Sequence, residues 1–173
     1  MKRLVSIIFF AVTLSCAPIY VNYDYETGTD FRKYRTYNMY PDMQTGLSEL
    51  DTKRLLNNVD QFLQANGFTV SDSPDFFVNI SSSEYQAERR SNVGVGVGGG
   101  GRNVGGGISV GIPIGSDDIN REMVFDFIDA EKDFLFWQAI SESSFNPNAI
   151  PEKREERLKA IVTKVFSKYP PKN

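Results

Sequence analysis

The sequence predicts an α+β protein, a two-layer sandwich in which a mainly antiparallel sheet carries two helices on one face. Three observations support this class. Segments with period-two alternation of apolar and polar residues come in adjacent pairs, which favours hairpins. Two other segments repeat apolar residues at helical spacing. The chain has 173 residues, 40% of them hydrophobic and 13% aromatic, enough for one packed core but too few for a multidomain enzyme.

The N-terminal half is predicted to contribute two strands and a helix. Tyr and Val alternate with polar residues over 20–25, and a second strand over 31–40 ends at Pro41. Ser48 begins a capping-box pattern that opens the helix, and Gly67 supplies its stop. One face of this helix carries Leu55, Leu56, Val59, Phe62 and Leu63.

The second half is predicted to contribute four strands and a helix, over residues 68–71, 75–85, 121–128, 134–141 and 151–169. Because apolar residues occupy both alternating sets in 121–128, we expect that strand to be central and covered on both faces. The last segment repeats apolar residues with a period of about 3.6 and has Pro151 in its first turn. Trp137, the only tryptophan, has apolar neighbours and is predicted to lie in the core.

The first residues are predicted to be a secretory signal. Lys2 and Arg3 form a basic start, and residues 4–14, which carry no charge, are too few for a membrane-spanning helix of roughly 20 residues. Thr13-Leu-Ser-Cys16 then resembles a bacterial lipobox, although Thr13 stands where such motifs most often carry Leu. An ordinary signal with a chance cysteine is the alternative, but a lone exported thiol is otherwise hard to explain. We predict removal of residues 1–15 and lipidation of Cys16.

Lipidation would attach residues 16–173 to a membrane, since each buried acyl CH₂ contributes about 0.8 kcal/mol. Loss of Lys2 and Arg3 shifts the formal charge from −3 to −5, so the body is not expected to lie flat on anionic lipid. No acidic residue follows Cys16 closely. Similarity to lipoprotein sorting rules then implies the outer membrane of a bacterial envelope, with the domain in the periplasm. Display of the domain on the outer surface of the cell is the alternative.

Four stretches occur in an order shared with a known family. They are Tyr20 to Tyr25 with Asp30 to Tyr37, Asn66 to Phe68 with Ser73 to Val78, Phe125 to Trp137, and Lys164 to Pro171. Together they resemble the bacterial lipoproteins catalogued as domain of unknown function 4136. The resemblance spans roughly residues 20–171, with a departure at Asn38-Met39, where the family often has Trp. It implies a lipid anchor and carries over no catalytic residue.

Residues 91–117 are predicted to form a glycine-rich insertion within the single domain. Residues 94–115 hold 11 of the 14 glycines, and apolar side chains alternate on two arms around a tip near Asn103, which favours a hairpin. A linker of no specific role and contact with lipid are the alternatives. The candidate contacts for a protein partner are Val93, Val95, Val97, Asn103, Ile108, Val110 and Ile112.

The same segment is not expected to bind a nucleotide. Residues 94–99 match G-x-G-x-x-G, but no helical pattern follows them and no Walker Lys-Ser/Thr pair is present. The acidic isoelectric point, near 5.1, argues against nucleic-acid binding.

Composition also excludes several catalytic classes. The chain has no His and one Cys, which excludes His-dependent triads, Cys-cluster and His-ligated metal sites, and internal disulfides. We expect no cofactor and no metal. Carboxylates remain as acid–base groups, but Asp126 and Asp129 should point to opposite faces of a strand, and Asp129 is expected to shape a turn. We therefore predict a protein that is not an enzyme, with an unrecognised carboxylate-based hydrolase as the alternative.

Six of the eight tyrosines fall between residues 20 and 40. Tyr20, Tyr23 and Tyr25 are candidates for stacking on glycan rings, although aromatic residues are also simply favoured in half-buried strands. The cations Lys153, Arg154 and Arg157 alternate with glutamates, which is typical of a solvated helix face.

Two functions follow as hypotheses. The first is a non-catalytic, lipid-anchored envelope lipoprotein that acts as scaffold or adaptor for another envelope protein, through the glycine-rich segment. The alternative is a lipoprotein that binds cell-wall glycan through an N-terminal tyrosine strip, whose candidate stacking residues are Tyr20, Tyr23 and Tyr25.

Overall fold

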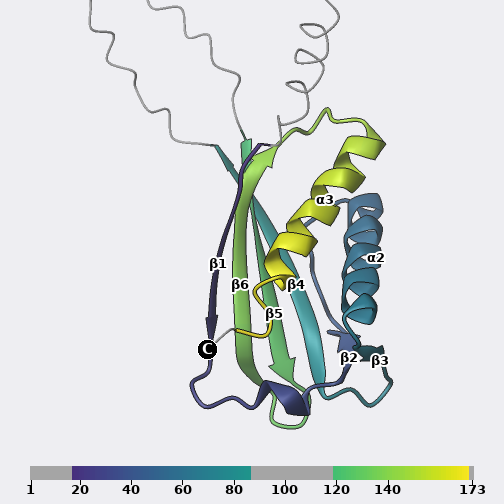
Figure 1. Ribbon diagram of the computed structural model, residues 1–173. Coiled ribbons are helices and arrows are strands. Elements are labelled where there is room, and N and C mark those ends of the chain that lie inside the picture. Colours follow the sequence, from purple (N-terminus) through teal and green to yellow (C-terminus); the bar gives the residue numbers. More distant parts are fainter. Residues whose placement is uncertain (1–16, 87–118, 172–173) are drawn as a thin grey trace, which may run out of the picture.

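The computed structural model describes residues 17–86 and 119–171, which form one six-stranded sheet with two long helices beside it (Figure 1). The predicted α+β class is confirmed. The strands are β1 (Ile19–Tyr25), β2 (Thr36–Met39), β3 (Thr69–Val70), β4 (Phe76–Gln86), β5 (Ile119–Asp129) and β6 (Phe134–Phe145), and the helices are α2 (Glu49–Ala65) and α3 (Pro151–Phe166). No helix within these residues is long and apolar enough to cross a membrane.

The sheet is mixed, with strand order β1-β6-β5-β4-β2-β3. The four longest strands, β1, β6, β5 and β4, pair antiparallel, whereas β2 pairs parallel with both β4 and β3. The parallel pairings arise because α2 carries the chain across the sheet between β2 and β4, as parallel neighbours require. The β5–β6 pair is a hairpin with a register shift after Phe127.

The helix boundaries follow local chemistry that the sequence predicts. The Ser48 hydroxyl accepts a hydrogen bond from the Asp51 amide at 3.3 Å and so satisfies one free N–H of the first turn of α2. Gly67 has φ of +88°, a conformation that glycine adopts without strain, directly after α2 ends. Pro151 begins α3, where its missing N–H costs nothing.

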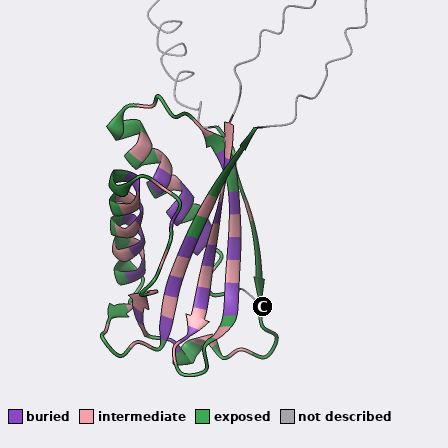
Figure 2. Cartoon of the chain, turned by 180° about the vertical axis from the view of Figure 1, so that it is seen from behind, coloured by how far each residue is buried: buried purple, intermediate pink, exposed green. Residues whose placement is uncertain are grey.

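The core lies between the sheet and the helices, and burial alternates along the central strands (Figure 2). From α2 it receives Leu55, Val59 and Leu63, all 1% exposed or less. Alternate sheet residues and α3 supply the rest, including Phe76, Phe125, Phe127, Trp137, Leu158, Ile161, Val162, Val165 and Phe166. Trp137 is fully buried, as predicted. Burial of each large apolar side chain contributes about 1.5–3 kcal/mol.

Two predictions about strands are wrong. Residues 31–40 do not form one strand, because Asp30 accepts the Arg32 amide at 3.2 Å and caps a short 3-10 helix, η1 (Phe31–Lys33). In β5 the odd-numbered residues from 121 to 129 are buried under the helices, while the even-numbered ones are only half-buried. Within the described residues, both helices cover the same face, so the strand is central in the sheet but covered on one side.

The predicted glycine-rich insertion, 91–117, and the predicted signal, 1–15, lie outside the described residues. Their flanks are described. Gln86 ends β4 and Ile119 begins β5, and the two residues pair with each other in the antiparallel register. Ile119 pairs with Phe145, and Ile19 pairs with Ser143 near it. The insertion and the N-terminus therefore leave the domain at the same end of the sheet (Figure 1).

Candidate functional site

The first described residues are held on helix α3. Arg157 donates from Nη1 to the Ala17 carbonyl at 2.7 Å and from Nη2 to the Pro18 carbonyl at 3.2 Å. Two helical turns further on the same flank, Lys164 Nζ donates to the Ile19 carbonyl at 2.5 Å. The chain directly after position 16 is thus fixed to the domain by side chains some 140 residues away.

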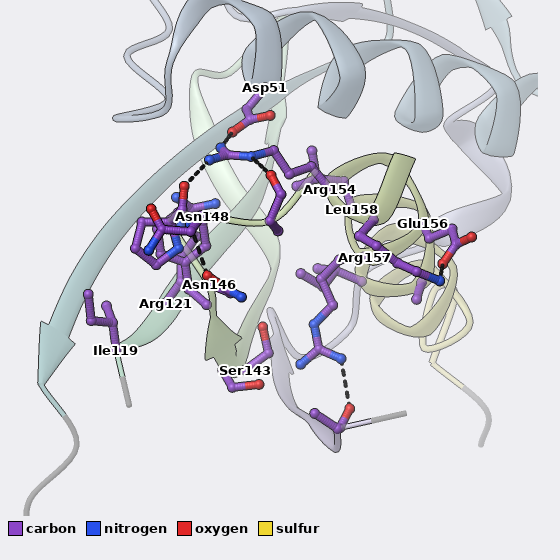
Figure 3. A pocket seen from close by; sticks show the side chains of 18 residues that line it. Asp51, Ile119, Arg121, Ser143, Asn146, Asn148, Arg154, Glu156, Arg157 and Leu158 are labelled. Atoms are coloured by element: carbon purple, nitrogen blue, oxygen red, sulfur yellow. Dashed lines mark hydrogen bonds and ion pairs between the residues drawn. The ribbon is translucent and has the colours of Figure 1, made fainter. Parts of the chain in front are cut away.

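A pocket of about 800 Å³ opens at this same end, between the start of α3, the end of β6 and the start of β5 (Figure 3). Ala17 lines it, so the pocket adjoins the point where the N-terminal chain leaves. Four cationic residues line it against two acidic ones: Arg121, Lys153, Arg154 and Arg157 against Asp51 and Glu156. The lining is therefore cationic in a protein whose formal charge is −3.

Asp51 lies at the helix side of the pocket and joins α2 to α3. Its Oδ2 is 2.6 Å from Arg154 Nη1, and its Oδ1 is 2.7 Å from Arg54 Nη1. Burial alone would raise the pKa of Asp51, but the hydrogen bonds from the two arginines outweigh it and hold the pKa below its ordinary value. Arg154 also donates from Nε to the Ala149 carbonyl, which fixes the loop before α3.

Arg121 lies on the sheet side of the pocket. Its Nη2 is 2.6 Å from Glu84 Oε1 on the neighbouring strand β4, and its guanidinium lies 3.5 Å from the centre of the Phe145 ring. The side chain is 9% exposed, and its Nε has no hydrogen-bond partner among the residues that the structure describes. The ion pair with Glu84 and the cation–π contact with Phe145 together stabilise this buried charge.

Ion pairs and charge-assisted hydrogen bonds are the main polar contacts in this pocket. Its guanidinium groups bind carboxylate and carbonyl oxygens. These contacts connect α3 to α2 and to the N-terminal chain, and β5 to β4. Within residues 17–86 and 119–171, no group of three or more His, Cys, Asp or Glu side chains is placed to hold a metal ion. The arrangement fixes the start of α3 with respect to α2 and the N-terminal chain at this end of the domain.

The prediction of a solvated basic face on α3 is wrong for Arg154 and Arg157. Arg154 is 24% exposed and bound to Asp51, and Arg157 binds the N-terminal carbonyls. A signal for this was present in the spacing. Arg154 lies four residues before Leu158, and Arg157 lies four before Ile161, so both extend the buried stripe of α3 toward its N-terminus. The spacing alone does not identify their partners.

The tyrosine strip is divided between two faces of the sheet. In β1 the side chains of Tyr23 and Tyr25 point to the helix side and Tyr20 to the opposite side, because strand residues alternate. Tyr20 is 66% exposed, Tyr23 42% and Tyr25 41%. Tyr25 also packs edge-on to Phe31, with ring centres 5.7 Å apart. The strip therefore offers one neighbouring pair and one separate ring.

Asp126 and Asp129 point to opposite faces of β5, as predicted. Asp126 accepts from Gln138 Nε2 at 2.7 Å on the helix-free face. Asp129 shapes the hairpin turn, accepting the Lys132 amide at 2.9 Å and, with its other oxygen, Lys33 Nζ at 2.7 Å. The two carboxylates are not brought together.

The other predicted site residues lie outside the described residues. These are the lipidation site Cys16 and the candidate partner contacts Val93, Val95, Val97, Asn103, Ile108, Val110 and Ile112.

A family model described as domain of unknown function (DUF4136) matches residues 21–171. The chain belongs to the DUF4136 family. The match begins within β1 and extends beyond α3. It covers both helices, the sheet apart from the first two residues of β1, and the pocket lining apart from Ala17. This confirms the resemblance drawn from the four stretches of sequence. Comparison with curated proteins finds no match.

Solved structures show likenesses of fold. A PDZ domain protein from Parabacteroides distasonis is 12% identical with a TM-score of 0.58, covering 99% of this chain and 41% of that one. This DUF4136 chain thus spans less than half the length of that protein. The PelC dodecamer from Paraburkholderia phytofirmans is 10% identical with a TM-score of 0.50, covering 87% of this chain and 96% of that one. At these identities the likeness concerns the fold alone.

Proposed function

We propose that this DUF4136 protein is a non-catalytic lipoprotein, anchored through Cys16 to the outer membrane of a bacterial envelope. It acts there as a scaffold or adaptor for another envelope component. The observation that carries the proposal is the attachment of Ala17, Pro18 and Ile19 to α3 by Arg157 and Lys164. A lipid on Cys16 would then be followed by no free linker.

This attachment supports a fixed orientation at the membrane. The pocket, the start of α3 and the flanks of the insertion, Gln86 and Ile119, all lie at the anchored end. The β5–β6 turn lies at the other end and would point away from the lipid (Figure 1). Such a scaffold would present its glycine-rich segment, with Asn103 near its tip, close to the membrane.

The anchor is tested by Cys16→Ser in the full chain expressed in cells. We expect the variant to lose acylation and to move from the membrane fraction to the soluble fraction, because the acyl chains supply most of the binding energy. Undiminished membrane association would contradict the proposal. Ser15→Ala, which leaves the cysteine in place, is the matched control.

The orientation is tested with a fluorophore on the lipidated protein in vesicles that contain a lipid-borne quencher. In lipidated protein the Cys16 sulfur is blocked, so an introduced cysteine is labelled alone. A label on Asn148→Cys, at the pocket, should be quenched several-fold more than one on Glu131→Cys, at the opposite turn. Equal quenching at the two positions would mean that the domain is not held upright. Arg157→Ala should reduce the difference.

The adaptor role is tested with a photo-crosslinking residue at Asn103 in living cells. One dominant protein adduct is expected, and mass spectrometry would identify the partner. Adducts to lipid alone, or no adduct, would leave the glycine-rich segment without a partner role.

Glycan binding is a second candidate, favoured by the exposure of Tyr20, Tyr23 and Tyr25. Because Tyr23 and Tyr25 share a face, they form the stacking pair in this version. It predicts that a soluble chain lacking residues 1–17 co-sediments with purified sacculi and is released by Tyr23→Ala. Sedimentation no greater than that of a control protein would exclude it.

A further inference from the structure

Within the part of the chain that the structure describes, strand β1 forms one edge of the sheet and pairs with β6 on one side only. In an antiparallel pair, alternate residues direct their N–H and C=O groups toward the partner strand or away from it. The Glu26 amide donates to the Phe136 carbonyl at 3.0 Å, which identifies the even-numbered residues as those bonded to β6. Ile19, Val21, Tyr23 and Tyr25 therefore direct their backbone groups outward.

The two ends of this edge are partly satisfied by side chains. Lys164 Nζ donates to the Ile19 carbonyl, and the Tyr25 amide donates to Asp24 Oδ1 at 2.8 Å. Between them, the N–H and C=O groups of Val21 and Tyr23 have no partner among the described residues. Two donors and two acceptors are thus left at the spacing of an extended strand.

Among residues 17–86 and 119–171, nothing supplies the usual protection against strand addition to the middle of this edge. Soluble proteins guard an exposed edge with Lys, Pro, a bulge or a covering element. The middle of β1, residues 20–24, contains neither Lys nor Pro, and its register with β6 is continuous. Tyr20 and Tyr23 add exposed aromatic surface on either side of the edge. The strand is suited to accept another strand.

The two faces of the sheet next to β1 indicate which side chains an added strand should have. On the helix side it would meet Val21, Tyr23 and Tyr25, which favour apolar side chains. The charged strand residues on the helix-free face are all acidic: Asp24, Glu122, Asp126 and Glu142. Arg121 is the only Lys or Arg within the six strands, and it lies on the helix side. Basic or neutral side chains are therefore favoured on the helix-free side.

A second copy of the chain fits this edge poorly. Antiparallel pairing of β1 with its own copy would place the two N-termini at opposite ends of the joined sheet. Two Cys16 anchors could then not enter one membrane. This step rests on the anchor in the proposed function, as does the choice of an envelope protein as partner.

We propose that the outward edge of β1, at Val21 and Tyr23, binds an extended segment of another envelope protein as a seventh strand. The segment alternates apolar residues toward the helices with basic or neutral residues on the other side. Backbone hydrogen bonds supply its affinity, and the alternating side chains supply its selectivity.

The test places the photo-crosslinking residue p-benzoylphenylalanine at position 23 of the full, lipidated chain in living cells. It is combined with Val21→Pro, which removes an outward N–H without breaking a β1–β6 hydrogen bond. We expect a protein adduct that falls at least tenfold in Val21→Pro, and a crosslinked partner peptide with the alternation described. Gln86→Pro is the matched control. It removes an outward N–H on the far side of the sheet, since the even-numbered β4 residues point away from β5.

The absence of a protein adduct, or an adduct unchanged by Val21→Pro, would overturn the proposal. So would an adduct that is a second copy of this chain, or one that contains only glycan. Should Val21→Pro fail to fold, Tyr23→Lys with the probe at position 25 replaces it and should reduce the adduct equally. The Cys16→Ser fractionation is independent: a protein that is anchored but shows no adduct at β1 removes this inference alone.

Discussion

Arg154 and Asp51 connect the two helices, with Arg154 Nη1 2.6 Å from Asp51 Oδ2 across 103 positions of sequence. Asp51 is also bound by Arg54, and its side chain is 3% exposed. The Asp51→Asn variant leaves two arginines facing a neutral group. We expect a loss of about 2 kcal/mol in the free energy of unfolding, measured by urea denaturation, as for a broken, partly buried ion pair. Glu156→Gln, at an exposed pair, should change it by less than about 0.5 kcal/mol.

Asp129 should make stability depend on pH in the acid range. Burial raises its pKa, but hydrogen bonds from Lys33, the Lys132 amide and Tyr34 outweigh this and lower the pKa to about 2. The unfolded chain therefore takes up the proton first, and the contribution of Asp129, present above about pH 4, is lost as pH falls toward 2. Urea unfolding at a series of pH values should show this loss. In Asp129→Asn the free energy of unfolding should fall less steeply with decreasing pH between about pH 4 and 2. An unchanged pH dependence would assign the effect to other carboxylates.

Tyr34 donates to Asp129 Oδ2 at 2.8 Å while its ring stacks on Phe136 at 3.9 Å. The Tyr34→Phe variant keeps the stacking and loses the hydrogen bond to a buried carboxylate. We expect about 1.5 kcal/mol of destabilisation. Tyr20→Phe, at an exposed position, should be close to neutral in the same denaturation experiment. Equal effects of the two variants would mean that the hydroxyl of Tyr34 contributes nothing specific.

Two glycines with positive φ should respond differently to alanine. Gly67 has open space where a Cβ would lie, so Gly67→Ala should cost about 1 kcal/mol from the backbone conformation alone. A Cβ on Gly46 would lie 2.6 Å from the Ser82 carbonyl oxygen, which is backbone and cannot move aside cheaply. Gly46→Ala should therefore lower the melting temperature clearly more than Gly67→Ala. The reverse order would show that the loop before α2 adapts.

The elements that local chemistry determines could be predicted from the sequence. The Ser48 cap, the Gly67 stop and the turn at Asp129 depend on neighbours within a few residues, and each was predicted. The α+β class followed from periodicity. The 3-10 helix at 31–33 was missed because its aromatic and basic residues also suit a strand, and only a cap by Asp30 distinguishes the two.

The candidate site was less predictable, because its contacts are long-range. Arg157 binds a carbonyl 140 positions away, and Lys164 one 145 positions away, and spacing in the sequence contains neither relation. The edge position of β1 is a property of strand order, which alternation within one strand does not reveal. The lipidation site and the partner contacts at 93–112 stay predictions.

The pairing of Gln86 with Ile119 has a consequence for how this protein can change over evolution. Both ends of the connection between β4 and β5 are held side by side by the ladder itself, so the sheet does not depend on what the connection contains. The entropic cost of closing such a loop grows by only about 0.6 kcal/mol for each doubling of its length. Related chains can therefore carry connections of different length and composition at this point while the sheet keeps its stability.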